Sequence, residues 1–400
     1  MVTATEDLVL TSPSSPLTPE QRHSRVTEKT YENNKASDYT EKIEELDRHF
    51  TYEANKDHYW GIPELSVLYG TPLYGQASEN QKLALNHLYW IGAYNMVAGS
   101  ETSTIFFNQV TANVFFKMGG YETLCHELDL ETNQERYHVH AFQNIDKQVR
   151  ASILGDTQED PHLAKTMNFL QTGLGGRLGS KRTMQFLSFN WGDTPFLASQ
   201  YYCMRYVANV VLKNKEYTYS LYCRELERKG KFVPAPTAIS RYHLLDESFH
   251  TTISQMLGKE FFKELPKPSR YEVFLINMVI YMAQKRILGG FSGAIPGSFI
   301  QDGVVFMPLI FSTLQSRLFN LSKSEALFWM EKIFCQEHQG FHITKKYHEK
   351  LVGDLSRFFG AIDHMWPVNK EMKCMRQGGS IANSIARNRR DFKTFCRSVA

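Results

Sequence analysis

The chain has 400 residues, 42% hydrophobic and 22% charged, with 45 Lys and Arg against 42 Asp and Glu for a net charge of +3. This composition is typical of a soluble globular protein and excludes the fibrous and low-complexity classes. Because the charges nearly balance, we expect no nucleic-acid partner. The six cysteines are widely spaced, no signal-peptide pattern is present, and the apolar runs fall short of the roughly 20 residues of a membrane helix. These features predict a cytoplasmic protein with no membrane partner.

The two ends of the chain differ from the middle. Residues 1–45 are rich in Ser, Thr, Pro, Glu and Asn and show almost no apolar periodicity, which predicts a disordered leader. Residues 366–400 contain the basic run Arg-Asn-Arg-Arg at 387–390 and predict a solvated, basic C-terminal tail. The remaining residues, 46–365, are predicted to form one helical domain.

Long segments between these ends have apolar residues at helical spacing. In chain order they cover 79–117, 121–154, 196–228, 237–257, 270–288, 299–321, 323–339 and 342–359. Gly and Pro fall mostly between the segments, and no alternation typical of strands occurs, so we predict an all-α fold. The stretch around 155–195 is an irregular insertion. Its glycine cluster at 173–176 lacks the Lys-Ser/Thr pair of a phosphate-binding loop and predicts a plain connection.

Two of the segments carry histidines and glutamates at metal-ligand spacing. At about 100° per residue, His243, Glu247 and His250 fall within roughly 60° of one another and share one helix face. Glu135 and His138, three residues apart, share a face of a different helix. Two Glu-x-x-His pairs on separate helices make up half of the carboxylate-bridged di-iron site of ferritin-like bundles. The spacing therefore predicts a metal site in the core of a helical bundle.

Such a site needs one further Glu from each of two other helices. Glu101 is the candidate in the first long segment, because an unpaired carboxylate would be costly in so apolar a helix. Each Glu-x-x-His pair alone could instead be a solvated pair, and His250 alone a hydrogen-bonded core histidine. The joint occurrence of both pairs with His243 and Glu101 favours metal binding. Iron(II) accepts imidazole and carboxylate together and keeps open positions for dioxygen.

The order Glu, then Glu-x-x-His, then a lone Glu, then His-x-x-x-Glu-x-x-His resembles the para-aminobenzoate N-oxygenase family of ferritin-like di-iron proteins, to which the cyanobacterial dimetal-carboxylate halogenases are related. The resemblance covers about residues 79–257. It implies a ferritin-like helical bundle, here with additional C-terminal helices. It implies two iron ions as cofactors, O2 as cosubstrate, an external electron donor, and chloride in the case of a halogenase. The ligands that it implies are Glu101, Glu135, His138, Glu216, His243, Glu247 and His250.

The lone Glu is the least defined of these positions. Glu216, Glu225 and Glu227 are the acidic residues in the third long segment, and the distance of Glu216 from the last motif looks like the family's. Lys213 and Lys215 lie close by, as on a solvated helix face, so a surface charge is the other interpretation of Glu216. If Glu216 is not a ligand, an open metal position would remain that a halide could fill.

Residues around the motifs have two interpretations each. Asp246 is predicted either to hydrogen-bond a ligating imidazole on a neighbouring helix or to be exposed. Glu131 is predicted to lie beside the ligands, to replace Glu135 as a ligand, or to be exposed. Arg286 and Arg317 are candidates to bind a substrate carboxylate. Aromatic residues near the ligands are candidates for a substrate pocket, although aromatic residues at helical spacing are more often core. They are Tyr94, Phe107, Tyr137 and Phe249.

Together these inferences favour an oxidative tailoring enzyme of secondary metabolism that halogenates or hydroxylates an unactivated C–H bond of an aliphatic or acyl substrate. Conversion of an arylamine to a nitroso or nitro product is the alternative that the resemblance implies. A non-catalytic helical or iron-binding protein is the alternative from another class. The expected partners are a small-molecule or carrier-protein-bound acyl substrate and an electron-donor system, and self-association as a homodimer stays open.

Overall fold

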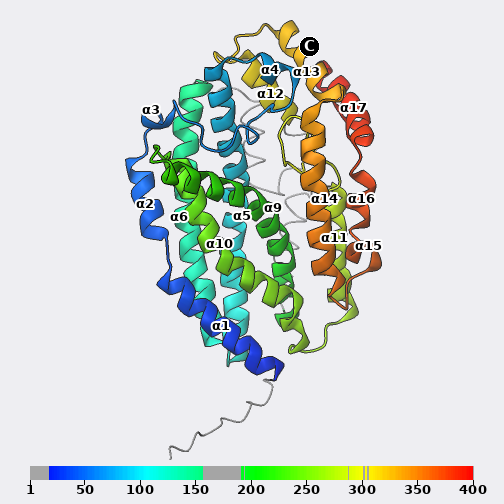
Figure 1. The fold of residues 1–400 in the computed structure, drawn as a ribbon. Helices are drawn as coiled ribbons and strands as arrows, with labels where there is room; N and C mark the ends of the chain where they lie inside the picture. The colour runs from blue at the N-terminus through cyan, green and yellow to red at the C-terminus, as the bar shows by residue number, and fades with distance from the viewer. Residues whose placement is uncertain are drawn as a thin grey trace, which may run out of the picture.

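The computed structural model describes residues 18–155, 191–192, 194–286, 288–300, 302–303 and 306–399. Within them all regular secondary structure is helical, and the chain is an all-α helical bundle, as predicted. Its four longest helices are α5 (Glu79–Met118), α6 (Glu122–Ile153), α9 (Pro195–Arg228) and α10 (Ala235–Lys259) (Figure 1). These bounds agree with the predicted segments to within a few residues. Most of the predicted insertion at 155–195, with its glycine cluster, lies outside the described residues.

The four long helices form two pairs, α5 with α6 and α9 with α10. Gly119 ends α5 with a φ of 76° and Gly120 follows with a φ of 82°, a left-handed conformation that glycine adopts without strain. In the other pair, α9 begins at Thr194, whose hydroxyl accepts a hydrogen bond from the N–H of Leu197. At Gly258 of α10 a Cβ would come within 2.9 Å of a backbone nitrogen of α9, so this pair packs closely.

The predicted disordered leader at 1–45 is wrong from residue 19 onward. There α1 (Pro19–Ala36) and α2 (Thr40–His49) both pack against α6 and α10 (Figure 1). Apolar periodicity did not reveal α1, because the side chains that it buries most fully are polar. They are His23, Thr27, Thr30 and Asn34. A helix whose buried face is hydrogen-bonded gives no periodic hydrophobic signal.

The helices that follow α10 lie largely on the α9 side of the bundle (Figure 1). The predicted helix at 299–321 is shorter, because the Asp302 carboxylate holds the preceding loop by accepting hydrogen bonds from the Ser292 hydroxyl and the Gly293 N–H. The long helices of this part are α11 (Arg270–Arg286), α12 (Phe306–Gln315), α13 (Lys323–Cys335), α14 (Gln339–Gly360) and α17 (Ile381–Val399). Short connecting helices are α3 (Tyr52–Asn55), α4 (Pro72–Gln76), η3 (Phe261–Lys263), α15 (Pro367–Lys370) and α16 (Lys373–Gly378).

The predicted solvated tail at 366–400 is also wrong, because α15, α16 and α17 occupy most of it and α17 packs against α13 and α14. Inside the basic run, Asn388 is buried and donates hydrogen bonds to Asp302 Oδ2 (2.9 Å) and to the Phe334 carbonyl (3.1 Å). Arg389 donates to the carbonyl of Cys335. The charges in this run hid a helix that buries Asn388 together with the apolar residues Ile385 and Phe395.

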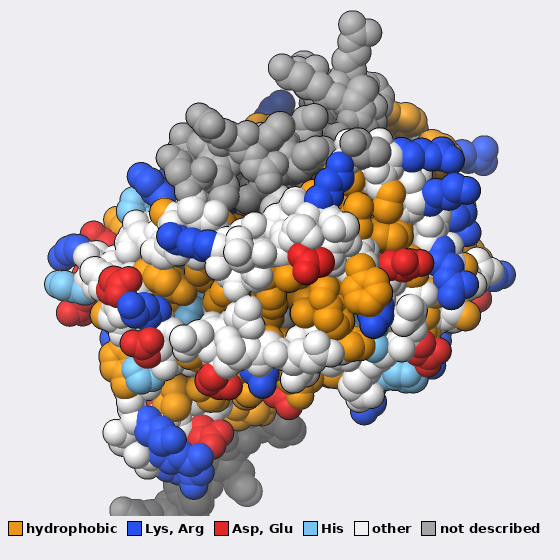
Figure 2. Space-filling model, turned by 90° about the horizontal axis from the view of Figure 1, so that it is seen from above, with side chains coloured by type: hydrophobic (Ala, Val, Ile, Leu, Met, Phe, Trp, Pro, Cys, Tyr) orange, Lys and Arg blue, Asp and Glu red, His pale blue; other side chains and the backbone are white. Residues whose placement is uncertain are grey.

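The surface of the described residues carries no large area of one kind in the view of Figure 2. Basic, acidic and hydrophobic side chains are interspersed there, in keeping with the near-balanced composition (Figure 2). None of the described helices has the length and apolar character needed to cross a bilayer.

Candidate metal centre

The four long helices bring all seven predicted ligands into the interior of the bundle. Each of these residues is at most 4% exposed. Glu101 comes from α5, Glu135 and His138 from α6, and Glu216 from α9. The remaining three, His243, Glu247 and His250, come from one face of α10. The ring centres of His138 and His250 lie 6.4 Å apart, although 112 positions separate these residues along the chain (250 − 138).

Six of the seven side chains form two groups whose potential ligand atoms lie within 4.8 Å of one another. One group is Glu101, His138, His243 and Glu247, and the other is Glu135, Glu247 and His250. Glu247 belongs to both groups, as a carboxylate that bridges two neighbouring cations would. These buried groups could hold metal ions.

The three imidazoles of the site share one arrangement. Each directs one ring nitrogen toward the carboxylates of the two groups, while the other nitrogen meets a buried oxygen acceptor outside them. Because that oxygen accepts, the outer nitrogen carries the proton. The outer pairs are His138 Nε2 with Asp246 Oδ2 (3.2 Å), His250 Nε2 with Gln134 Oε1 (2.9 Å) and His243 Nδ1 with Glu216 Oε1 (2.6 Å). Such contacts fix the tautomer and orientation of metal-binding imidazoles.

Glu216 and Asp246 therefore both lie at outer positions. The surface interpretation of Glu216 is wrong, because this side chain is 1% exposed and also accepts a hydrogen bond from the Tyr94 hydroxyl (2.8 Å). Glu216 and Glu101 contact opposite nitrogens of the His243 ring, and Glu216 is not a member of the two groups. Its second oxygen, Oε2, has no hydrogen-bond partner among the described residues. Asp246 makes the contact with a site imidazole on a neighbouring helix that the sequence predicted.

Three buried atoms within the two groups have no hydrogen-bond partner in the described part of the chain. They are Glu101 Oε2, Glu135 Oε2 and His138 Nδ1, the last lying 3.6 Å from Glu135 Oε2. A buried polar atom without a partner is costly and calls for an explanation. Carboxylate oxygens and imidazole nitrogens are ligand types that iron and similar metals accept. The residues present therefore fit metal ions.

The electrostatics of the site show an excess of negative charge. Burial, followed by the nearby Glu135 carboxylate, raises the pKa of Glu101 to about 7, against the opposing effect of His243. Burial lowers the pKa of His243, but the Glu216 and Glu101 carboxylates outweigh it and raise this pKa well above its ordinary value. In the metal-free protein, protonated imidazoles thus supply the positive charge that balances the carboxylates. In the metal-bound protein, the cations would supply this charge.

The protonation of His138 predicts a pH dependence for the metal-free protein. Burial and His243 lower its pKa, but hydrogen bonds with Asp246 and Glu135 prevail and raise it from 6.5 to about 9. Since the folded-state pKa is raised, the stabilisation is fully present below about pH 6.5 and is lost as the pH rises through about 9. We expect the Tm of chelator-treated protein to fall across this window in scanning calorimetry. An unchanged or rising Tm would contradict the assigned protonation.

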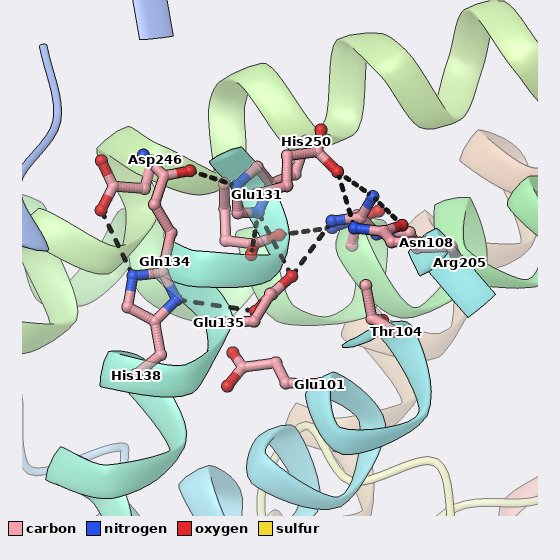
Figure 3. A network of polar contacts seen from close by, with 12 residues as sticks. Glu101, Thr104, Asn108, Glu131, Gln134, Glu135, His138, Arg205, Asp246 and His250 are labelled. Carbon is pink, nitrogen blue, oxygen red and sulfur yellow. Dashed lines mark hydrogen bonds and ion pairs between the residues drawn. The ribbon is translucent and has the colours of Figure 1, made fainter. Parts of the chain in front are cut away.

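Arg205 is a central residue of the site that the sequence analysis missed (Figure 3). It is 4% exposed, and its guanidinium lies 2.5 Å from Glu131 Oε2 and 3.0 Å from Glu135 Oε1. Glu131 is thus buried and contacts Arg205, outside the two groups. Arg205 lies in the apolar stretch 196–211 of α9. The argument that identified Glu101, that a charge in an apolar helix requires a buried partner, could therefore have identified Arg205 as well.

The predicted carboxylate-binding arginines do not lie at the site as far as the structure describes them. Arg317 donates hydrogen bonds to the carbonyl oxygens of Ala151 (3.0 Å) and Ile153 (3.3 Å), at the end of α6. The prediction that Arg317 binds a substrate carboxylate is wrong, because its guanidinium donates its hydrogen bonds to backbone carbonyls of α6. The side chain of Arg286 lies outside the described residues.

Among the predicted pocket residues, Tyr94 donates a hydrogen bond from its hydroxyl to the Glu216 carboxylate (2.8 Å). Tyr137 is 37% exposed on α6, and its role in a pocket stays a prediction. Phe107 is half-buried and stacks on an aromatic ring of α9, with 4.1 Å between ring centres. Phe249 is half-buried on α10. For these last two, a role in a pocket stays a prediction.

The buried carboxylates and imidazoles that converge from four helices of this all-α bundle could hold metal ions, as such side chains do in helical-bundle metalloproteins. The chain belongs to the CylC-like acyl halogenase family, because the family model described as "Acyl halogenase CylC-like" matches residues 22–165 and 158–396. It is thus a member of a halogenase family. Of the two related families in the resemblance, the match supports the halogenases and not the para-aminobenzoate N-oxygenases. Searches of curated proteins and of solved structures gave no significant match.

Proposed function

We propose that this protein is a di-iron, O2-dependent enzyme that halogenates or hydroxylates an unactivated C–H bond of an aliphatic or acyl substrate in secondary metabolism. The observation that carries the proposal is that Glu247 belongs to both buried ligand groups in a chain of the CylC-like acyl halogenase family. A shared carboxylate would hold two cations next to each other in a dry interior.

We assign six residues as iron ligands: Glu101, Glu135, His138, His243, Glu247 and His250. When bound, iron would supply the reaction with dioxygen and the oxidation of an unactivated C–H bond, which side chains alone do not perform. We give Glu216 the task of orienting His243, because it contacts the ring nitrogen opposite the one that faces Glu101 and is not a member of the two groups. If Glu216 is not a ligand, chloride could bind the metal in its place.

The chain itself excludes water and keeps the ligands in place. Because each ligand residue is at most 4% exposed, the surrounding helices shield the reacting centre from solvent. Asp246, Gln134 and Glu216 each hold one imidazole in a fixed tautomer through the outer nitrogen. Arg205 balances the charge of Glu131 and directs one oxygen of Glu135.

The substrate and the other reactants belong to the proposal as well. The description of the matching family names acyl halogenation, which favours an acyl group over an arylamine. We propose that the acyl group is presented as a free small molecule or as a thioester on a carrier protein. We propose that the enzyme takes its electrons from an external donor system.

The experiment that tests the proposed activity is product analysis by mass spectrometry. Reduced, iron-loaded protein is mixed with O2 and fatty acyl substrates, free and carrier-bound, with and without chloride. We expect a product with the chlorine isotope pattern when chloride is present, and none without O2. Hydroxylated product in both reactions would identify a hydroxylase.

Candidate arylamines are included in the same assay as the competing substrate class. Conversion of an arylamine to a nitroso or nitro product, with no change in any acyl substrate, would overturn the proposed substrate and favour the N-oxygenase alternative. Absence of bound metal after purification with iron, together with absence of every product, would favour a non-catalytic helical protein.

A further inference from the structure

The N-terminal helix α1 reaches the interior of the bundle through Asn34. This side chain is fully buried, and its amide makes three hydrogen bonds with α6. Its Nδ2 donates to Glu127 Oε1 (3.0 Å) and to Gln134 Oε1 (3.3 Å), and its Oδ1 accepts from Gln134 Nε2 (2.9 Å). The amide of Gln134 is therefore held at both its oxygen and its nitrogen by one residue of α1.

Gln134 in turn contacts a site imidazole. Its Oε1 lies 2.9 Å from His250 Nε2 (Figure 3). The opposite nitrogen of that ring lies 2.7 Å from Glu247 Oε1. Because Asn34 fixes which end of the Gln134 amide faces His250, the imidazole meets an acceptor and keeps its proton on Nε2. Nδ1 is then the nitrogen available to a metal ion.

The turn between α1 and α2 makes a second contact of the same kind. The backbone N–H of Tyr39 donates to Asp246 Oδ1 (3.4 Å), while Asp246 Oδ2 accepts from His138 Nε2 (3.2 Å). Asp246 is fully buried, so its two oxygens depend on these protein donors. Residues 34–39 thus contact the hydrogen-bond acceptors of two imidazoles, one from each ligand group: Gln134, which accepts from His250, and Asp246, which accepts from His138.

We propose that the segment 34–39 positions His138 and His250 for metal binding, and that Asn34 is a positioning residue of the metal centre. This inference rests on the proposed function, since it requires that the two groups bind metal. Partners of this kind typically change metal affinity about 10- to 100-fold when they are removed. The segment predicted as a disordered leader is then part of the metal site.

The test is a cobalt(II) titration of metal-free protein, followed by visible absorption and by chelator competition. We expect Asn34→Ala to weaken cobalt binding about 10-fold and to alter the absorption bands of the bound metal. The matched control is Asn369→Ala, because Asn369 is also fully buried and also makes three hydrogen bonds, with Asn277 and Gln284. That control should lose comparable thermal stability and keep its cobalt affinity within about 2-fold.

A second pair of variants separates positioning from folding. Gln134→Leu removes the acceptor of His250 and should weaken cobalt binding about 10-fold, whereas Gln134→Glu keeps acceptor oxygens and should restore most of the affinity. Wild-type affinity in both Asn34→Ala and Gln134→Leu would overturn the positioning role, as would equal losses in Asn369→Ala. Failure of the unmodified protein to bind cobalt or iron would overturn the proposed function itself.

Discussion

Replacement Glu247→Ala is expected to abolish metal loading at both positions. Glu247 is the one residue that the two groups share, so its removal takes a carboxylate from each of them. It also leaves His250 Nδ1 without its contact of 2.7 Å to Glu247 Oε1 and the Asn209 amide without the acceptor that it contacts. Metal analysis of protein produced with iron should find about two ions per chain before the change and close to none after it.

The control for this experiment is Glu225→Ala, the same change at an exposed residue of α9 that pairs with Lys229. It should leave the metal content unchanged. Circular dichroism of both variants establishes that they are folded and helical. A folded Glu247→Ala protein that retains both ions would show that the metal ligands lie elsewhere.

The second large effect is expected for Arg205→Met, measured as the free energy of unfolding in urea. Arg205 is the buried cation that contacts both Glu131 and Glu135, and methionine fills similar space without charge. Removing one partner of a buried ion pair typically costs about 3–5 kcal/mol, because the carboxylates stay buried without compensation. We expect a loss of this size in metal-free protein, and a smaller loss when metal contacts Glu135.

Two further variants test the reason for this loss. Adding Glu131→Gln to Arg205→Met removes one of the uncompensated charges and should recover part of the stability. The surface comparison is Arg241→Met, because the Glu227 partner of Arg241 is 49% exposed and such pairs contribute about 0–1 kcal/mol. Equal losses for Arg205→Met and Arg241→Met would contradict the charge-balancing role of Arg205.

Local helix geometry is what made the long helices and much of the site predictable. Apolar residues at helical spacing predicted α5, α6, α9 and α10. In α5 the burial is not confined to one face, because every residue from Ala84 to Ile91 is buried. The spacing of three and four residues placed Glu135 with His138, and His243 with Glu247 and His250, on common faces. Glu101 was recognisable because its charge interrupts an apolar segment. Each of these inferences needs information from one helix only.

Polar buried faces explain the largest errors. α1 reaches the interior through Asn34, and α17 buries Asn388 inside its basic run, so both helices looked like solvated ends. Hydrogen-bonded asparagines and threonines stabilise a buried face as long as each polar atom finds a partner. A single sequence shows the polar residue but not its partner, since Asn34 and Gln134 lie 100 positions apart.

What the sequence by itself determined is the all-α class, the four central helices and the faces on which the histidines and glutamates lie. Only the tertiary structure decided that Glu216 contacts the outer side of His243, that Arg205 joins Glu131 to Glu135, and that α1 supports the acceptor of His250. The physical reason is that helix periodicity depends on neighbours three and four residues away. Partner choice depends on how whole helices pack, and contacts between residues 27 to 100 positions apart leave no trace in local spacing.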